Sequence, residues 1–203
     1  MNIRLAELND LDQIVDVHFS AFPDFFLTGL GRKFLKQYYK IYIKYSHIAF
    51  VAEKHGVIEG FVVGSNNSTV FYKDLKKEII NFIFPMLVNI FNFHLLSKIV
   101  KRVFSVLFKK KVNSSLKPYD ELNELTSIGI ILNDQNRGLG SLLLAKYERY
   151  CIEENVKGIT LTTDANKNEK VLKFYKKFGY SIDKTFVQDE KRTMYSLVKY
   201  FND

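Results

Sequence analysis

The stretch LTSIGIILNDQNRGLGSLLLAKYERY, residues 125–150, decides how the rest of the chain is interpreted. It opens with an apolar run that ends at Leu132 and indicates a buried strand. Residues 133–137 are polar and break the run, and Gly138 and Gly140 follow. Apolar residues then recur at helical spacing, at Leu139, Leu142, Leu143 and Tyr147. The stretch therefore predicts a strand, a polar turn with glycines, and a helix.

Such a turn suits a phosphate group. The first N–H groups of a helix have no partner within the helix and carry partial positive charge. Glycines at that point let a phosphate come close to the backbone. The turn does not end in Gly-Lys-Ser/Thr and does not read G-x-G-x-x-G, so it fits neither nucleotide-binding pattern. The alternative is a strand-to-helix turn whose glycines serve packing alone.

Composition is consistent with one globular domain. The chain has 203 residues, of which 47% are hydrophobic and 26% charged, enough for one sizeable core. Its start has no signal-peptide pattern, and Cys151 is the only cysteine, so we expect a cytoplasmic location and no intrachain disulfide. Cys151 falls within the predicted helix and is interpreted as a structural thiol. The four histidines are scattered, and no metal site is predicted.

The segments on both sides alternate between helix and strand patterns. Before residue 66 we expect a short strand at 2–5, helices around 11–19 and 34–42, and a hairpin of strands 47–53 and 57–65. The loop at 21–29 between the helices is rich in Phe, which favours a packed lid or a binding surface. After the glycine turn we expect a strand at 158–163, a helix ending at Gly179, and strands at 181–187 and 193–198.

Residues 67–120 interrupt this order. Residues 73–111 hold nine Lys/Arg and two Asp/Glu, a net charge of +7 out of +8 for the whole chain. Residues 79–97 carry no charge, but their Asn residues, His94 and Pro85 argue against a membrane span. The basic amphipathic helix that follows could contact an anionic membrane through residues 79–111, or pack on its own domain or on a second subunit as a homodimer. Basicity confined to one segment does not predict a nucleic-acid binder.

Two motifs resemble those of the GNAT superfamily of N-acetyltransferases. The first is Q-x-x-G-x-G, formed by Gln135, Gly138 and Gly140. The second is formed by Asn168, Tyr175, Gly179 and Tyr180, with Val171 where alanine is usual. The resemblance covers about 2–65 and 121–198. It implies an α/β (α+β) GNAT fold: a mixed, mostly antiparallel sheet flanked by helices. The chain would be a single domain, 1–203, with a basic helical insertion at 73–117 between central strands.

The resemblance also implies roles for matching residues. The co-substrate would be acetyl-CoA, bound without a metal. Tyr175 would protonate the departing thiolate, and a phenol can do so within hydrogen-bond reach. Asn168 would contact the cofactor from the start of the last helix. Backbone groups of the strand and turn would bind the pantetheine and the pyrophosphate, and they belong to Ile130, Leu132, Gln135, Asn136, Arg137, Gly138, Leu139 and Gly140.

The general base and the acceptor stay open. Many family members place a carboxylate on the strand before the turn, and here that strand has Glu124 only at its entry. Glu53, Glu124 and His47 are the candidate bases for direct transfer in a ternary complex. Residues 21–40 resemble a segment of GNAT proteins linked to surface polysaccharides, which suggests a small-molecule amine such as an amino sugar. The alternatives are an acetyltransferase of protein N-termini or lysines, and a non-catalytic acyl-CoA-binding module at the inner membrane face.

Overall fold

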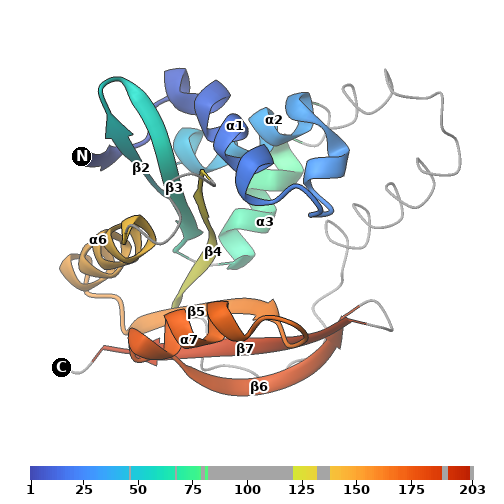
Figure 1. Cartoon of the computed structure of the whole chain (residues 1–203), viewed down its shortest axis with the longest axis vertical. Coiled ribbons are helices and arrows are strands. Elements are labelled where there is room, and N and C mark those ends of the chain that lie inside the picture. Colours follow the sequence, from blue (N-terminus) through green and yellow to red (C-terminus); the bar gives the residue numbers. More distant parts are fainter. Residues whose placement is uncertain are drawn as a thin grey trace, which may run out of the picture.

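The computed structural model describes residues 1–45, 47–66, 68–78, 81, 121–131, 138–188 and 192–201. These residues form a seven-stranded sheet in the order β1-β2-β3-β4-β5-β7-β6 (Figure 1). The strands are β1 (Asn2–Leu5), β2 (Ile48–Lys54), β3 (Val57–Ser65), β4 (Asn123–Ile130), β5 (Gly158–Asp164), β6 (Ser181–Gln188) and β7 (Arg192–Tyr200). Among them, β4 and β5 are the one parallel pair.

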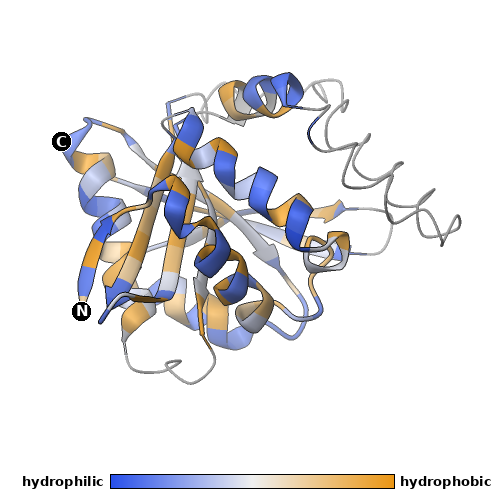
Figure 2. Ribbon diagram, turned by 90° about the horizontal axis from the view of Figure 1, so that it is seen from above, coloured by the Kyte–Doolittle hydropathy of each residue, from blue (hydrophilic) through white to orange (hydrophobic). Residues whose placement is uncertain are grey.

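Helices cover both faces of the sheet. They are α1 (Leu11–Ala21), α2 (Arg32–Lys44), α3 (Ser68–Lys77), α6 (Leu139–Glu153) and α7 (Glu169–Lys177), with 3-10 turns η1 (Leu8–Asp10) and η2 (Thr28–Leu30). Alternate residues of β3 show the two faces, because Phe61 and Val63 pack with α1 and α2 whereas Val62 packs with α6. In Figure 2, α1 and α2 turn hydrophilic residues outward, as amphipathic helices on a core do.

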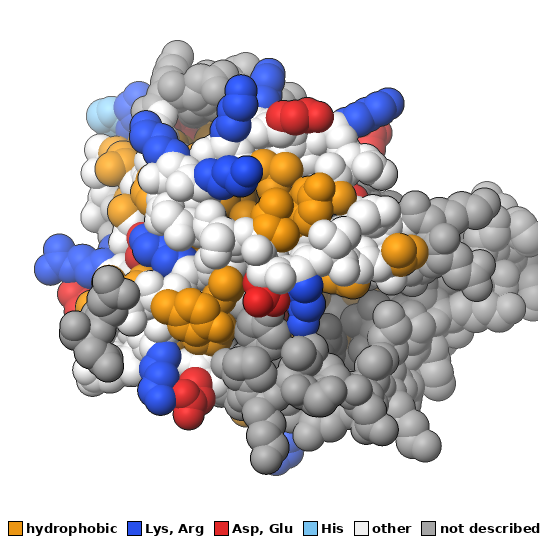
Figure 3. Space-filling view, turned by 90° about the horizontal axis from the view of Figure 1, so that it is seen from below, with side chains coloured by type: hydrophobic (Ala, Val, Ile, Leu, Met, Phe, Trp, Pro, Cys, Tyr) orange, Lys and Arg blue, Asp and Glu red, His pale blue; other side chains and the backbone are white. Residues whose placement is uncertain are grey.

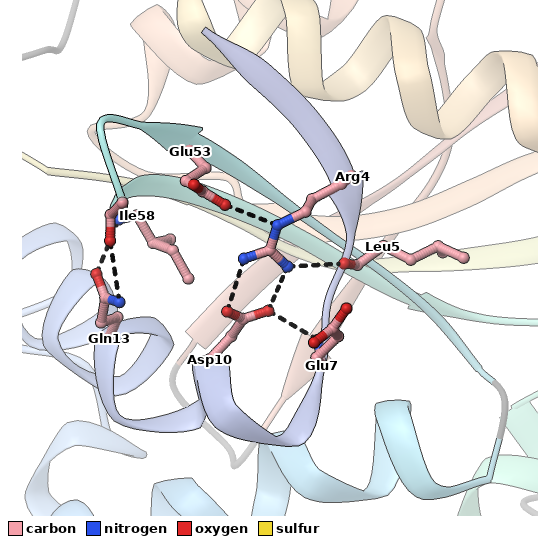
Figure 4. Close-up of polar contacts among 8 residues, drawn as sticks. Arg4, Leu5, Glu7, Asp10, Gln13, Glu53 and Ile58 are labelled. Carbon is pink, nitrogen blue, oxygen red and sulfur yellow. Dashed lines mark hydrogen bonds and ion pairs between the residues drawn. The ribbon is translucent and has the colours of Figure 1, made fainter.

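The N-terminal edge of the sheet is held by charge. Arg4 on β1 donates from Nε to Glu53 on β2 (2.7 Å) and from Nη1 to Asp10 (2.7 Å), as Figure 4 shows. Asp10 also accepts a hydrogen bond from the backbone N–H of Glu7. Gln13 of α1 accepts a hydrogen bond from the backbone N–H of Ile58 on β3 at 2.9 Å. The first helix is therefore tied to both β1 and the hairpin.

Strand β4 contains a bulge that changes which side chains face α2. Leu125 pairs with Gly64 and Ser127 pairs with Val63, so Thr126 has no partner on β3. Before the bulge, Asn123 bonds Cys151 of α6 and Leu125 packs in the α6 core. After it, Ser127 lies on the opposite face. One extra residue in a strand moves each later side chain to the face opposite the one that strict alternation would give it.

Helix α3 is bound to the core at the start of the predicted insertion. Its Phe71 and Leu75 are buried beside α2, and Glu78 accepts a hydrogen bond from Tyr45 at 2.7 Å and pairs with Lys44. The rest of the insertion, residues 82–120, lies outside the described residues. Within the part that is described, no helix is both long and apolar enough to cross a bilayer.

The sheet ends at β6, whose outward side chains are partly hydrophobic. Ile182 and Val187 are exposed there, and Val171 is exposed on α7. Figure 3 shows hydrophobic side chains gathered among Lys and Arg side chains on the face seen from below. The homodimer that the sequence analysis offered as one explanation of the basic segment stays a prediction.

Candidate active site

The sheet opens between β4 and β5. These strands pair only at Asn123–Ile159 and Glu124–Thr160, among the residues described, and separate beyond that point. Figure 1 shows β4 diverging from β5. The backbone of β4 past Glu124 is therefore left without β5 as a hydrogen-bonding neighbour. Free N–H and C=O groups of that kind can bind an extended ligand by adding to the sheet.

The glycine turn before α6 is described from Gly138 onward, and this part has the backbone conformation that favours glycine. Gly138 is the N-cap of α6 and has φ of 81°, in the left-handed region that favours glycine. A Cβ on Gly140 would lie 3.1 Å from Cδ1 of Ile130, so the helix start packs closely on β4. The first N–H groups of α6 therefore point out of a tight strand-to-helix junction. Leu132, Gln135, Asn136 and Arg137 lie outside the described residues.

Tyr175 is held on the apolar side of α7, in the same core as Leu139 of α6 and Leu161 of β5. Its ring packs against those of Phe174 and Tyr180, with centroids 5.1 and 5.5 Å away. Burial raises the pKa of the Tyr175 hydroxyl, which keeps it protonated at neutral pH. Within the described structure that hydroxyl makes no hydrogen bond. A buried phenol that stays protonated has a proton that it can donate.

The Asn168 side chain, which the family resemblance led us to expect at the cofactor, makes hydrogen bonds within the protein. Its Nδ2 donates to Oγ1 of Thr163 at 2.6 Å and to the carbonyl of Asp164 at 3.0 Å. It is also the N-cap residue of α7. The side chain therefore fixes the turn between β5 and α7, which places Tyr175. Its role in cofactor contact stays a prediction.

The face of β4 toward α2 is polar. The Ser127 side chain lies close enough to Tyr39, and the Thr126 side chain close enough to Tyr42, to oppose the rise in pKa that burial causes in both tyrosines, and Tyr42 also lies close to Glu124. A Cβ on Gly129, further along, would lie 2.6 Å from the Phe61 ring and 3.2 Å from the Phe22 ring. The opposite face of β4 carries Ile128 and Ile130, which pack against the α6 core. From Thr126 to Ile130, the polar side chains of β4 therefore lie on the α2 side.

The candidate bases differ in environment. Glu53 is paired with Arg4 at the β1 edge of the sheet. His47 is buried with Nε2 at 3.3 Å from Asp74, and burial lowers its pKa despite that carboxylate. Glu124 lies where β4 and β5 separate, and burial raises the pKa of its carboxyl. A raised pKa makes a carboxylate a stronger base, so Glu124 suits the role best.

Sequence reasoning missed His18, which the structure places beside this face. Its ring nitrogens lie 2.6 Å from the Tyr39 hydroxyl and 3.1 Å from Oγ1 of Thr28. Burial lowers its pKa to about 4, so it is neutral at pH 7. The sequence signal was weak, because His18 occupies an apolar face of α1 where a core residue is the usual occupant.

Neither the thiol of Cys151 nor any group of side chains that could hold a metal supplies a reactive centre among the described residues. Cys151 is buried, accepts a hydrogen bond from Asn123, and burial raises its pKa to about 12. Its thiol is inert by that measure, as expected of a structural cysteine. In the described part of the chain, no three His, Cys, Asp or Glu side chains are grouped as a metal site.

The Phe-rich loop reaches the C-terminal half of the sheet. The guanidinium of Arg192 lies over the Phe25 ring, 5.8 Å from its centroid. Arg192 also forms a bidentate pair with Asp164 at the end of β5, which holds the Asp164 pKa below its usual range. Phe25 therefore lies beside Arg192 at the start of β7, which is itself paired with the end of β5.

Comparison with known proteins finds a family match over the part of the chain that contains this site. Residues 114–180 match the model of the acetyltransferase (GNAT) family. The uncharacterized protein YxbD of Bacillus subtilis (strain 168) is 42% identical over 64 residues, which are 32% of this chain and 38% of that protein. The matched region thus spans well under half of that relative.

Solved structures resemble the whole chain. Ard1 from Thermoplasma volcanium has a TM-score of 0.63 at 13% identity, covering 100% of this chain and 98% of its own. Ribosomal-protein-alanine N-acetyltransferase from Brucella melitensis also gives 0.63 at 13% identity, covering 99% and 100%. An N-acetyltransferase from Staphylococcus aureus Mu50 gives 0.61 at 14% identity, covering 98% and 97%.

The predicted fold is confirmed: a mixed, mostly antiparallel sheet flanked by helices, with β4 and β5 parallel. The family model adds a match that includes the glycine turn and the segment containing Asn168 and Tyr175. Residues 114–180 of the chain therefore resemble the GNAT family of acetyltransferases, and the chain shares the fold of solved acetyltransferase structures.

Proposed function

We propose that this protein transfers the acetyl group of acetyl-CoA to the primary amine of a small molecule, directly within a ternary complex. The observation that carries the proposal is the opening between β4 and β5, which adjoins the left-handed Gly138 at the start of α6. The pyrophosphate would bind the first N–H groups of α6 and the turn before it. The pantetheine would bind the free backbone edge of β4.

The chemistry follows from the groups at the opening. A neutral amine attacks the thioester carbonyl from the α2 side, where β4 is polar, and the tetrahedral adduct collapses with loss of the thiolate. Tyr175 donates its proton to the sulfur, and Glu124 accepts the proton released by the amine, directly or through water. Burial keeps the Tyr175 hydroxyl protonated, so it has a proton to give, and burial raises the pKa of the Glu124 carboxyl, which makes its carboxylate a stronger base. No acyl-enzyme is formed, because the Cys151 thiol is buried and protonated.

The acceptor would be an amino sugar. The support is the likeness of residues 21–40 to GNAT proteins of surface-polysaccharide synthesis and the rings that this segment presents. Phe22 lies on Gly129, and Phe25 is 42% exposed beside Arg192. An exposed aromatic ring suits packing against the apolar face of a sugar. Cytoplasmic location follows from that substrate class, and the inner membrane face is the alternative if residues 79–111 bind lipid.

A screen for thiol release tests the function. Acetyl-CoA is mixed with wild-type protein and with UDP-linked amino sugars, polyamines, or peptides carrying free N-termini or lysines. We expect turnover with an amino sugar and none without an amine. Turnover confined to peptides would favour protein acetylation instead. Acetyl-CoA binding by calorimetry without release of thiol to any amine would support the non-catalytic module.

Direct transfer has its own test. Rapid mixing with acetyl-CoA in the absence of an amine should give no burst of free thiol. A burst equal to the enzyme concentration would show a covalent acetyl-enzyme and contradict the ternary-complex mechanism.

A further inference from the structure

A series of side-chain contacts joins β4 to β5 across the opening between them. The last pair that these parallel strands form, among the residues described, is Glu124 with Thr160. Gly129 lies further along β4 and Asp164 is the last residue of β5, so both lie where the strands have separated. Contacts that lead from Gly129 to Asp164 therefore cross the opening.

On β4 the series begins at Phe22, directly after α1. A Cβ on Gly129 would lie 3.2 Å from the Phe22 ring, so this ring lies against the bare backbone of β4. Phe22 also packs against the core that α1 and α2 form, so the contact is on the face opposite α6. Its N–H donates to the His18 carbonyl at 2.9 Å, and its carbonyl accepts from the Thr28 hydroxyl. Phe22 is therefore a fixed anchor.

On β5 the series ends in an ion pair. Arg192, the first residue of β7, donates from Nε to Oδ1 of Asp164 at 2.5 Å and from Nη2 to Oδ2. Next to this pair, the backbone N–H of Ala165 donates to the Thr193 carbonyl at 2.9 Å. Asn168 donates from Nδ2 to the Asp164 carbonyl at 3.0 Å. Arg192 is therefore anchored to the end of β5 and to the turn that starts α7.

Phe25 links the two anchors. Its ring centroid lies 5.9 Å from that of Phe22 and 5.8 Å from the guanidinium carbon of Arg192. Phe25 is 42% exposed, and the Arg192 side chain is 33% exposed. A cation–π contact between such exposed groups is weak. The link can therefore open and close while its two ends stay in place.

We propose that Phe22, Phe25 and Arg192 form a strap over the acceptor side of the opening, and that Arg192, by holding Phe25, limits the bulk that an acceptor carries beside its nitrogen. This inference rests on the proposed acetyl transfer, in which the amine approaches from the α2 side. An acceptor that is too bulky for the closed strap must break the contact between Phe25 and Arg192. Arg192 acts through Phe25 and is a positioning residue.

A single tryptophan reports whether Arg192 holds the ring at position 25. The chain has no tryptophan, so Phe25→Trp places the only one in the strap and keeps an aromatic face for the guanidinium. Adding Arg192→Gln should move the emission to longer wavelength and increase quenching by acrylamide, because the ring becomes more accessible to water. Identical emission and quenching with and without Arg192 would overturn the inference, and no substrate is needed.

Two CoA thioethers measure the limit on bulk. Each is CoA-S-CH2-CO-NH-R, which places R where the acceptor lies; R is methyl in one and adamantyl, bulkier than a sugar ring, in the other. Calorimetry gives the Kd of each. Arg192→Gln should bind the adamantyl compound about fivefold more tightly than wild type, the gain expected when one exposed cation–π contact no longer has to be broken. The Kd of the methyl compound should not change.

Variants of Phe25 test the same contact from its other side. Phe25→Leu removes the ring and leaves the ion pair of Arg192 with Asp164, so it should give the same gain for the adamantyl compound. Phe25→Tyr keeps the ring and should bind as wild type. Phe25→Leu combined with Arg192→Gln should gain no more than either change alone, because both remove one contact. Circular dichroism checks that each variant is folded.

Arg32→Gln is the matched control. The guanidinium carbon of Arg32 lies 5.8 Å from the centroid of the Phe19 ring, and its Nη1 lies 2.5 Å from Asp16. Arg32 thus has an aromatic and a carboxylate partner like those of Arg192, but both belong to α1, so these contacts do not cross the opening. Arg32→Gln should leave the Kd of both thioethers unchanged.

The outcomes separate this inference from the function on which it rests. If wild-type protein transfers acetyl groups but Arg192→Gln binds both thioethers as wild type does, the function stands and the strap is overturned. An equal gain for the methyl and adamantyl compounds would also overturn it, since bulk would then not matter. If wild-type protein neither binds acetyl-CoA nor releases thiol with any amine, the transferase function fails, and the limit on acceptor bulk fails with it.

Discussion

Tyr175 is the residue whose environment bears most directly on the reaction. Its ring is fixed between Phe174 and Tyr180, and burial keeps its hydroxyl protonated. Tyr175→Phe removes the proton donor and preserves the packing. We expect kcat to fall about 10²-fold, the lower end of general acid–base contributions, with acetyl-CoA affinity nearly unchanged. Steady-state kinetics and calorimetry on the same preparation measure both quantities.

Tyr200→Phe is the control for that variant, because Tyr200 is 55% exposed at the end of β7. It should react at the wild-type rate. A Tyr175→Phe enzyme with unchanged kcat would assign the leaving-group proton to another donor.

Gly138 tests the phosphate-binding turn at a single position. Its φ of 81° tolerates asparagine or aspartate better than most side chains, and no atom of the described residues lies within 4 Å of an added Cβ. Gly138→Asp places a carboxylate beside the phosphates and should weaken acetyl-CoA binding at least 100-fold. Gly138→Asn carries similar strain without charge and should bind much more tightly. Equal affinities for the two variants, measured by calorimetry, would contradict a phosphate at this helix start.

The residues that sequence alone could place are those with a local signature. Gly138 was identified by its position between a strand and a helix, and Gly179 by its position after one. His18 carries no such signature, because its contacts with Tyr39 and Thr28 depend on α1, α2 and η2 meeting in space. Asn168 is the reverse case: its place in the motif could be recognised in the sequence, but its hydrogen bonds to Thr163 and Asp164 of β5 could not be predicted from it.

At the scale of elements, β1 depends on one ion cluster. Asp10 has a side chain only 8% exposed, and Arg4 holds its pKa below the usual range. Arg4→Ala leaves that carboxylate buried and unpaired, a loss of about 3 kcal/mol. The Tm should fall by roughly 10 °C for a domain of this size. Differential scanning calorimetry measures the shift.

Arg32→Ala is the matched control for that change. Its ion pair with Asp16 is exposed: the Arg32 side chain is 49% exposed and the Asp16 side chain is 61% exposed. Exposed pairs contribute about 0.5 kcal/mol, so the Tm should move by roughly 2 °C or less. Equal shifts for the two variants would show that Arg4 is not what secures β1.

Periodicity predicted the helices and strands well because each buries one continuous face. Strand β3 and helix α2 lie within two residues of the expected bounds. The bulge at Thr126 was not predictable, since the sequence of β4 does not say which of its residues β3 leaves unpaired. The second half of α3, residues 73–77, was assigned to the insertion by its charge, yet Leu75 packs in the core together with Phe71.

At the scale of the whole molecule, stability should fall in acid before carboxylates titrate. His18 has its pKa lowered from 6.5 to about 4, so the unfolded chain binds the proton more tightly. The resulting stabilisation is complete above pH 6.5 and is lost as the pH falls toward 4. Between pH 7 and 5 this group alone should remove about 2 kcal/mol from the free energy of unfolding.

Urea titrations at pH 7 and pH 5 measure that dependence. His18→Gln is less stable at neutral pH because it disrupts the bonds to Tyr39 and Thr28, but its stability should depend less on pH across this range. Asp10 and Glu78, with lowered pKa values, should lose their contributions only below about pH 4. A wild-type stability that does not change between pH 7 and 5 would contradict a neutral buried His18.

The boundary of the insertion can be tested by deletion. The sequence predicted an insertion at 73–117, but α3 begins at Ser68 and its Phe71 is 7% exposed against the rings of Tyr38 and Tyr42. Glu78 adds polar contacts with Lys44 and Tyr45. We therefore expect the core to include α3 and to end close to residue 81.

Two deletions distinguish the boundaries. Replacing residues 82–118 by a Gly/Ser linker of about 12 residues should leave the Tm within a few degrees of wild type and preserve acetyl-CoA affinity, because flexible closures of different length differ little in entropy. Replacing residues 67–118 in the same way removes Phe71 and Leu75, which should cost about 2–5 kcal/mol and uncover Tyr42. If both deletions melted alike, α3 would be part of the insertion. If the shorter deletion aggregated, residues 82–118 would be covering the core, and the insertion would not be peripheral.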